Sequence, residues 1–93
     1  KIKKIDLLKI DTEGNEYNVL KGAKSLLKKN KILLIYVEIS ETKKNYEKKE
    51  KKIINFLKKY NFELISSYKM KSFSILSGLR ANDSLFVNRN IIN

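Results

Sequence analysis

Three carboxylates stand beside two apolar runs of the sequence. The first run, Ile5–Ile10 (IDLLKI), is short and mostly apolar, which predicts a buried strand, and Asp11 and Glu13 follow it. The second run, Lys31–Ser40 (KILLIYVEIS), is the clearest predicted strand, with its carboxyl end expected at Glu38. Because the carboxyl ends of parallel strands lie at the same edge of a sheet, we expect all three carboxylates on one rim. Ligands of open α/β sheets bind at this rim. Such groups can act as acid or base, hold a hard cation or bind a cationic ligand.

A purely structural role for these residues stays open at this point. Asp11, Thr12 or Glu13 can cap the next helix, where a negative charge also complements the helix dipole. Glu38 can neutralise a nearby lysine. Lys9 alternates with Asp11 along the predicted strand, so an ion pair between the two is expected rather than a catalytic lysine.

The elements that must position these residues alternate between strands and helices. Asn15–Lys29 has a helical pattern that Gly22 interrupts, which predicts a second short helix over Ala23–Lys29, stopped by Asn30. The unbroken apolar stretch Ile32–Val37 indicates burial on both faces of a sheet.

The second part of the chain continues this alternation. A charged stretch, Glu41–Lys52, leads into an amphipathic helix, and the alternating residues of Phe62–Met70 predict an antiparallel or edge strand. We expect irregular structure over Phe73–Asn82 and a last short strand at Ser84–Val87. The predicted fold class is α/β, with parallel strands, helical crossovers and a final antiparallel hairpin. A sheet of so few strands leaves an open edge and an uncovered face.

The aromatic side chains form no evident stacking platform in the sequence, so we expect them in the core. They include Tyr17, Tyr36, Tyr46, Tyr60, Tyr68 and the four phenylalanines.

The amino-acid composition excludes several kinds of catalytic and metal site from this chain. The 93 residues suffice for one small domain, and the chain begins at Lys1 rather than Met, as expected of a fragment. It has no cysteine and no histidine, which excludes disulfides, thiolate metal sites and a histidine base from this chain. No apolar run approaches the ~20 residues that span a bilayer, and the expected location is the cytoplasm.

The net charge of +11 raises a second hypothesis. Lysines are densest over Lys43–Lys59, which is typical either of a solvated helix face or of a small module that binds RNA or another polyanion. Such a module would lose affinity steeply with added salt.

The stretch from Ile5 to Leu27, IDLLKIDTEGNEYNVLKGAKSLL, resembles the FkbM family of S-adenosylmethionine-dependent methyltransferases. That family shows a strand ending Lys-Ile-Asp-x-Glu-Gly, then Glu, then a Val-Leu-x-Gly-Ala helix. The matching residues here are Lys9, Asp11, Glu13, Gly14, Glu16, Val19, Leu20, Gly22 and Ala23. The strand LLIYVEIS with Glu38 and the closing NDSLFVNR are similar to later family strands, in the same order.

The resemblance implies a Rossmann-like class I methyltransferase sheet, of which residues 1–93 form the carboxyl-terminal half. The Gly-x-Gly loop and the acidic residue for the cofactor ribose would lie in an absent amino-terminal half, so this chain alone is expected to be inactive. It implies that Asp11 lies beside the methionine part of S-adenosylmethionine. Glu13 and Glu38 would face the acceptor, as hydroxyl ligands or as the catalytic base. The implied acceptor is a hydroxyl of a sugar, glycolipid or secondary metabolite. The carboxylates have the chemistry to hold magnesium, but we expect no metal there.

Overall fold

Strands and helices alternate along the chain in the predicted order. The computed structural model describes residues 4–12, 14–69 and 78–92. Its elements are β1 (Ile5–Ile10), α1 (Glu16–Gly22), α2 (Lys24–Lys28), β2 (Ile32–Thr42), α3 (Tyr46–Lys58), β3 (Phe62–Lys69) and β4 (Leu79–Asn88).

The strands form one mixed sheet in the order β1-β2-β4-β3. β1 and β2 are parallel, and the connection between them runs through α1 and α2, as a parallel pair requires. β4 lies between β2 and β3 and is antiparallel to both. This α/β sheet with an antiparallel final pair agrees with the predicted fold class.

The helical segment after β1 divides at Gly22, as its sequence predicts. α1 ends at Gly22, Ala23 caps it, and α2 begins at Lys24. Asn30 and Asn61 then follow α2 and α3 with φ angles of 54° and 67°, a left-handed conformation that asparagine tolerates at helix ends.

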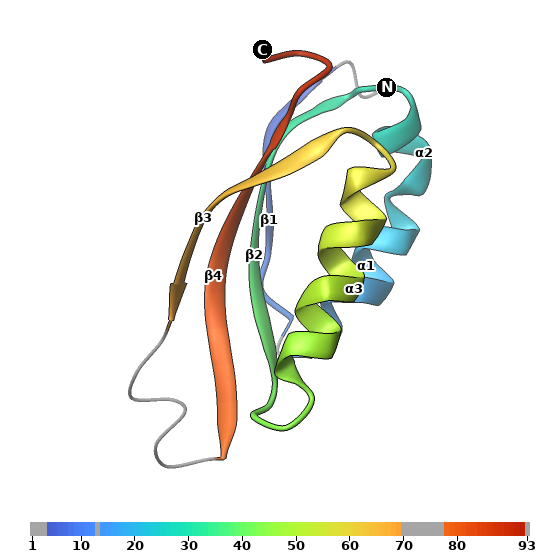
Figure 1. Cartoon of the computed structure of the whole chain (residues 1–93). Coiled ribbons are helices and arrows are strands. Elements are labelled where there is room, and N and C mark those ends of the chain that lie inside the picture. Colours follow the sequence, from blue (N-terminus) through green and yellow to red (C-terminus); the bar gives the residue numbers. More distant parts are fainter. Residues whose placement is uncertain (1–3, 13, 70–77, 93) are drawn as a thin grey trace.

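The helices pack on one face of the sheet, as Figure 1 shows. Alternate residues of β2 point toward them, because successive strand side chains point to opposite faces. The core between the layers includes Leu20, Leu27, Ile35, Val37, Ile39, Tyr46, Ile53, Leu57 and Phe86, all at most 1% exposed.

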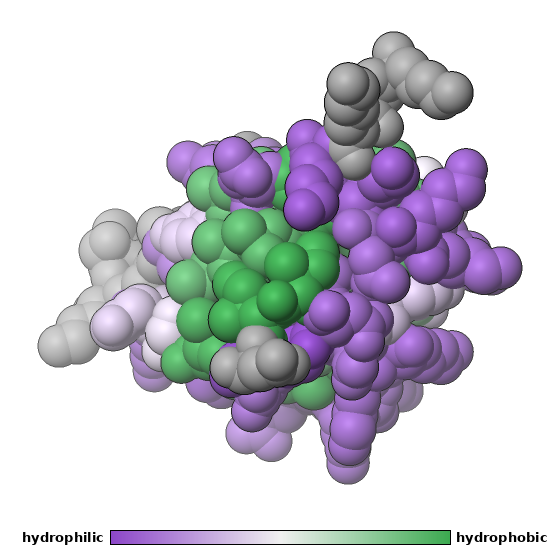
Figure 2. Space-filling model, turned by 90° about the horizontal axis from the view of Figure 1, so that it is seen from above, coloured by the Kyte–Doolittle hydropathy of each residue, from purple (hydrophilic) through white to green (hydrophobic). Residues whose placement is uncertain are grey.

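The opposite face of the sheet carries no helix among the described residues (Figure 1). Leu7 pairs with Leu34, and Tyr36 with Leu85, so these four side chains share that face. Leu7 is half-exposed, and the other three are partly exposed. Figure 2, which views the molecule from above and not straight onto this face, shows an apolar region bordered by hydrophilic residues. The predicted uncovered face is confirmed, whereas burial of Ile32–Val37 on both faces is wrong for this chain.

Two strands are longer than expected. β2 continues past Glu38 to Thr42, and β4 begins at Leu79 instead of Ser84. The two extensions pair with each other, from Ile39 with Asn82 to Thr42 with Leu79. Backbone pairing therefore makes a strand of residues 79–82, which have no strand pattern of their own; residues 70–77 lie outside the described part.

No helix in the described part of the chain is long and apolar enough to cross a membrane.

Candidate functional site

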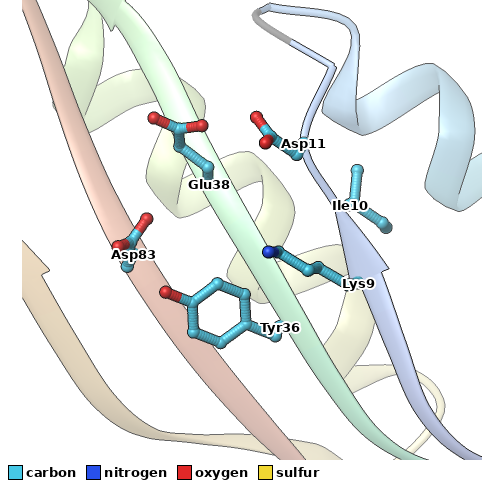
Figure 3. A pocket seen from close by; sticks show the side chains of 6 residues that line it. All are labelled: Lys9, Ile10, Asp11, Tyr36, Glu38 and Asp83. Atoms are coloured by element: carbon cyan, nitrogen blue, oxygen red, sulfur yellow. The ribbon is translucent and has the colours of Figure 1, made fainter.

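A hollow of about 210 Å³ opens on the uncovered face, at the carboxyl end of β1. It is lined by Lys9, Ile10, Asp11, Tyr36, Glu38 and Asp83 (Figure 3). These residues come from β1, the residue after it, β2 and β4.

Strand register explains why these side chains meet. Lys9 pairs with Tyr36 across β1 and β2, and Glu38 pairs with Asp83 across β2 and β4. Tyr36 and Glu38 are two residues apart on β2 and so point to the same face. Figure 3 shows the side chains of Lys9, Tyr36 and Glu38 on the side of the sheet away from the helices.

The structure brings two of the three expected site residues together. Asp11 lies directly after β1, and Glu38 lies within β2 rather than at its end. Both line the same hollow. Glu13 lies outside the described residues. The roles assigned to the three carboxylates stay predictions.

Sequence reasoning missed Tyr36, which was expected in the core. Figure 3 shows its hydroxyl on the side of Asp83. Hydrogen bonding to Asp83 is the largest cause that raises the pKa of Tyr36 above its usual value of 10.0, followed by burial and the negative charges of Asp83, Glu38 and Asp11. The phenol therefore stays protonated at neutral pH. The position of Tyr36 two residues before Glu38 was the available signal.

Two other residues of the hollow also differ from expectation. The ammonium of Lys9 lies 5.9 Å from the ring centroid of Tyr36, within range of a weak cation–π contact. Asp83 had no expected role, because nothing local in the sequence reveals which strand it pairs with. The expectation of core aromatics also fails for Tyr68, which is 71% exposed.

The charge of the hollow is opposite to that of the whole chain. Three carboxylates, from Asp11, Glu38 and Asp83, face one ammonium, from Lys9. This donor set suits a ligand that carries a positive charge or several hydroxyl groups. Over residues 4–12, 14–69 and 78–92, no three His, Cys, Asp or Glu side chains are grouped closely enough to hold a metal ion.

The loop that carries Asp11 does not cap the next helix. Asn15 occupies the N-cap of α1 and makes no side-chain capping bond. Thr12 donates instead to the carboxylate of Glu16, over 3.3 Å from Oγ1 to Oε2. Helix capping by Asp11 or Thr12, one of the structural alternatives, is therefore wrong.

The lysine-rich segment is partly built into the fold. Lys49 is an ion-pair partner of Glu16 at 2.7 Å, and its side chain is only 13% exposed. The ammonium of Lys52 lies 4.1 Å from the ring centroid of Tyr17. Lys51, Lys58 and Lys59 are exposed.

A mixed α/β sheet with helical crossovers and a polar hollow at the carboxyl end of a parallel strand is consistent with a methyltransferase-like fold. The family model described as "Methyltransferase FkbM domain" matches residues 1–64, and the chain belongs to this methyltransferase family. The expected family is thus confirmed. Neither the curated proteins nor the solved structures gave a match.

The family match spans most of the site. It includes Asp11, Tyr36 and Glu38, whereas Asp83 lies beyond it. It also includes all of Lys43–Lys59, so the comparison supports methyl transfer and gives no support to the separate polyanion-binding module.

Proposed function

We propose that this chain is the carboxyl-terminal half of a methyltransferase domain that transfers a methyl group from S-adenosylmethionine to a hydroxyl acceptor. The observation that carries the proposal is the acidic hollow, in which Asp11 of the family block lies with Glu38 and Tyr36. The acceptor class is a sugar, a glycolipid or a secondary metabolite.

The residues of the hollow fit the cationic part of S-adenosylmethionine. Three carboxylates line a hollow of a chain whose net charge is +11, so this surface attracts cations where most of the protein repels them. Asp11 would hold the methionine portion, which carries an ammonium group. When bound, S-adenosylmethionine supplies an electrophilic methyl group on a sulfonium sulfur.

The remaining residues of the hollow have the chemistry to bind and deprotonate a hydroxyl. Glu38 accepts a hydrogen bond or a proton, and Glu13 has the same capacity. Tyr36 is neutral, and because its one proton is directed to Asp83, its oxygen can accept a hydrogen bond from a hydroxyl. Because the chain has no histidine, a base from these residues must be a carboxylate or a lysine.

The proposal places the rest of the cofactor site in a preceding segment of polypeptide. The Gly-x-Gly turn that holds the cofactor is not found in these 93 residues. β1 ends the described sheet on one side and could pair with a further strand. We expect the DNA upstream of Lys1 to encode a strand followed by a Gly-x-Gly turn in the same frame. A start codon at this boundary and a stop codon before it would contradict the two-halves proposal.

The site is tested in the full-length protein by calorimetric titration with S-adenosylmethionine and by turnover. Asp11→Asn should weaken cofactor binding, and Glu38→Gln should lower turnover, each by about tenfold or more, because a charged hydrogen bond is lost. Glu63→Gln is the matched control, since Glu63 is a largely exposed carboxylate of the same sheet outside this hollow.

Each substitution tests a separate role and can contradict that role alone. Unchanged cofactor affinity in Asp11→Asn would remove Asp11 from the cofactor site. Unchanged turnover in Glu38→Gln would remove Glu38 from the acceptor side.

A further inference from the structure

Glu16 is a fully buried carboxylate that holds three separate segments of the chain. Its Oε2 accepts hydrogen bonds from the Thr12 hydroxyl, at 3.3 Å, and from the Gly14 amide. Its Oε1 accepts from the Ser40 amide near the end of β2, at 3.3 Å. The same Oε1 forms the ion pair with Lys49 of α3 at 2.7 Å.

Lys49 ties the same segments together a second time. Its ammonium donates to the carbonyl oxygen of Ser40 at 2.7 Å and to that of Gly14 at 3.1 Å. The loop after β1 and the end of β2 are thus each bound by both members of one ion pair. All the described contacts of this pair use side-chain or backbone atoms of residues within the family match.

Burying an ion pair costs free energy, so stabilisation of the fold does not by itself explain why this pair is present. Burying a carboxylate and an ammonium costs hydration that their attraction often fails to return. What the pair does supply is a defined distance between two segments. The residues it holds flank the hollow: Thr12 and Gly14 follow Asp11, and Ser40 lies two residues after Glu38.

We propose that Glu16 and Lys49 are positioning residues that fix the β1–α1 loop against the carboxyl end of β2. They thereby set the spacing of Asp11 and Glu38 across the hollow. Neither residue lines the hollow itself. The effect on ligand binding rests on the proposed function, whereas the effect on the loop does not.

The loop is tested by amide hydrogen exchange in the full-length protein. Glu16→Gln should speed exchange of the Gly14 and Ser40 amides by about tenfold or more, because both lose a charged acceptor. Exchange at Phe86, in the middle of β4, should rise by no more than the variant's loss of unfolding free energy accounts for. Glu63→Gln, which removes a largely exposed carboxylate at the other end of the sheet, should change none of these rates.

The site is tested by titration with S-adenosylmethionine. Glu16→Gln should weaken binding by about tenfold to a hundredfold, since small displacements of positioning groups have effects of this size. Lys49→Arg keeps the positive charge and should retain affinity within about threefold, whereas Lys49→Met should lose as much as Glu16→Gln. A purely structural role would lower the melting temperature of these variants without this ordering of affinities.

The outcomes separate the two proposals. Unchanged exchange at Gly14 and Ser40 in Glu16→Gln would overturn the positioning role, and so would faster exchange with wild-type affinity. If Glu16→Gln does not fold, two other variants test the positioning role by the same measurements. They are Lys49→Arg and the double variant Glu16→Gln/Lys49→Met. Wild-type protein that does not bind S-adenosylmethionine would refute the proposed function, and exchange would still decide whether the pair holds the loop.

Discussion

The two ends of the sheet are held together by different chemistry. At the carboxyl end of β1 and β2, a buried ion pair, Glu16 with Lys49, joins a loop, a strand and a helix beside the charged hollow. At the other end, an exposed ion pair, Glu63 with Arg89, lies beside a network of neutral amides. Asn61 donates to Asn90 at 2.6 Å, Asn90 to Asn30 at 2.9 Å, and Asn88 to the carbonyl of Ile32 at 2.9 Å.

The two ends differ in the free-energy cost of their buried polar contacts. Of the network, Asn88 is buried, whereas Asn30, Asn61 and Asn90 are exposed at the two helix–strand turns. A buried amide costs little when it is hydrogen-bonded, as Asn88 is. An ion pair loses much more hydration on burial. In this protein the costly interaction lies beside the hollow, and the inexpensive one lies at the end with no proposed site. We infer that the amide end serves the fold and the ionic end also serves the site.

The largest effect is expected from Lys49→Met, which leaves the Glu16 carboxylate buried without its counter-charge. The free energy of unfolding should fall by about 3–5 kcal/mol, measured by urea denaturation. The control is Arg89→Met, which breaks the Glu63–Arg89 pair, whose side chains are 60% and 37% exposed. That change should cost at most about 1 kcal/mol. Equal losses at the two pairs would contradict the contrast between the two ends.

A smaller loss is expected from Asn88→Ala at the amide end. Asn88 is fully buried, and its removal leaves the Ile32 carbonyl without this donor. Unfolding free energy should fall by about 1–3 kcal/mol, with affinity for S-adenosylmethionine unchanged. Asn55→Ala, at an exposed position of α3, should stay within about 0.5 kcal/mol. Weakened cofactor binding in Asn88→Ala would show that the amide end also shapes the site.

The smallest effect concerns the titration of Tyr36 and is measured at high pH. Because the pKa of Tyr36 is raised in the folded state, the phenol stabilises the fold below its unfolded pKa of 10.0, and this contribution is lost as pH rises through the folded value. The difference in ultraviolet absorbance between wild type and Tyr36→Phe follows this single phenol. In the Asp83→Asn background the same difference should titrate at lower pH, since the largest cause of the shift is gone. An unmoved titration would contradict the Tyr36–Asp83 hydrogen bond.

Local patterns in the sequence were enough to predict most of the elements. The apolar run before Asp11, the break at Gly22 and the stop at Asn30 each depend on a few neighbouring residues. So does the expectation that Asp11 and Glu38 lie on one rim, because parallel strands joined by a helical crossover bring their carboxyl ends together. The family, too, followed from a continuous stretch of residues, as its match confirms.

Tertiary structure alone decided the features that depend on pairing between distant residues. Residues 79–82 became a strand because β2 offered them partners, and Asp83 reached Tyr36 through the register of β2 and β4. Glu16 and Lys49 are 33 positions apart, so no local pattern reveals that they form one buried pair. Side-chain periodicity says which face of an element is apolar. Which charged groups meet on the other face is set by how the elements pair and pack, and in this protein that packing built the hollow.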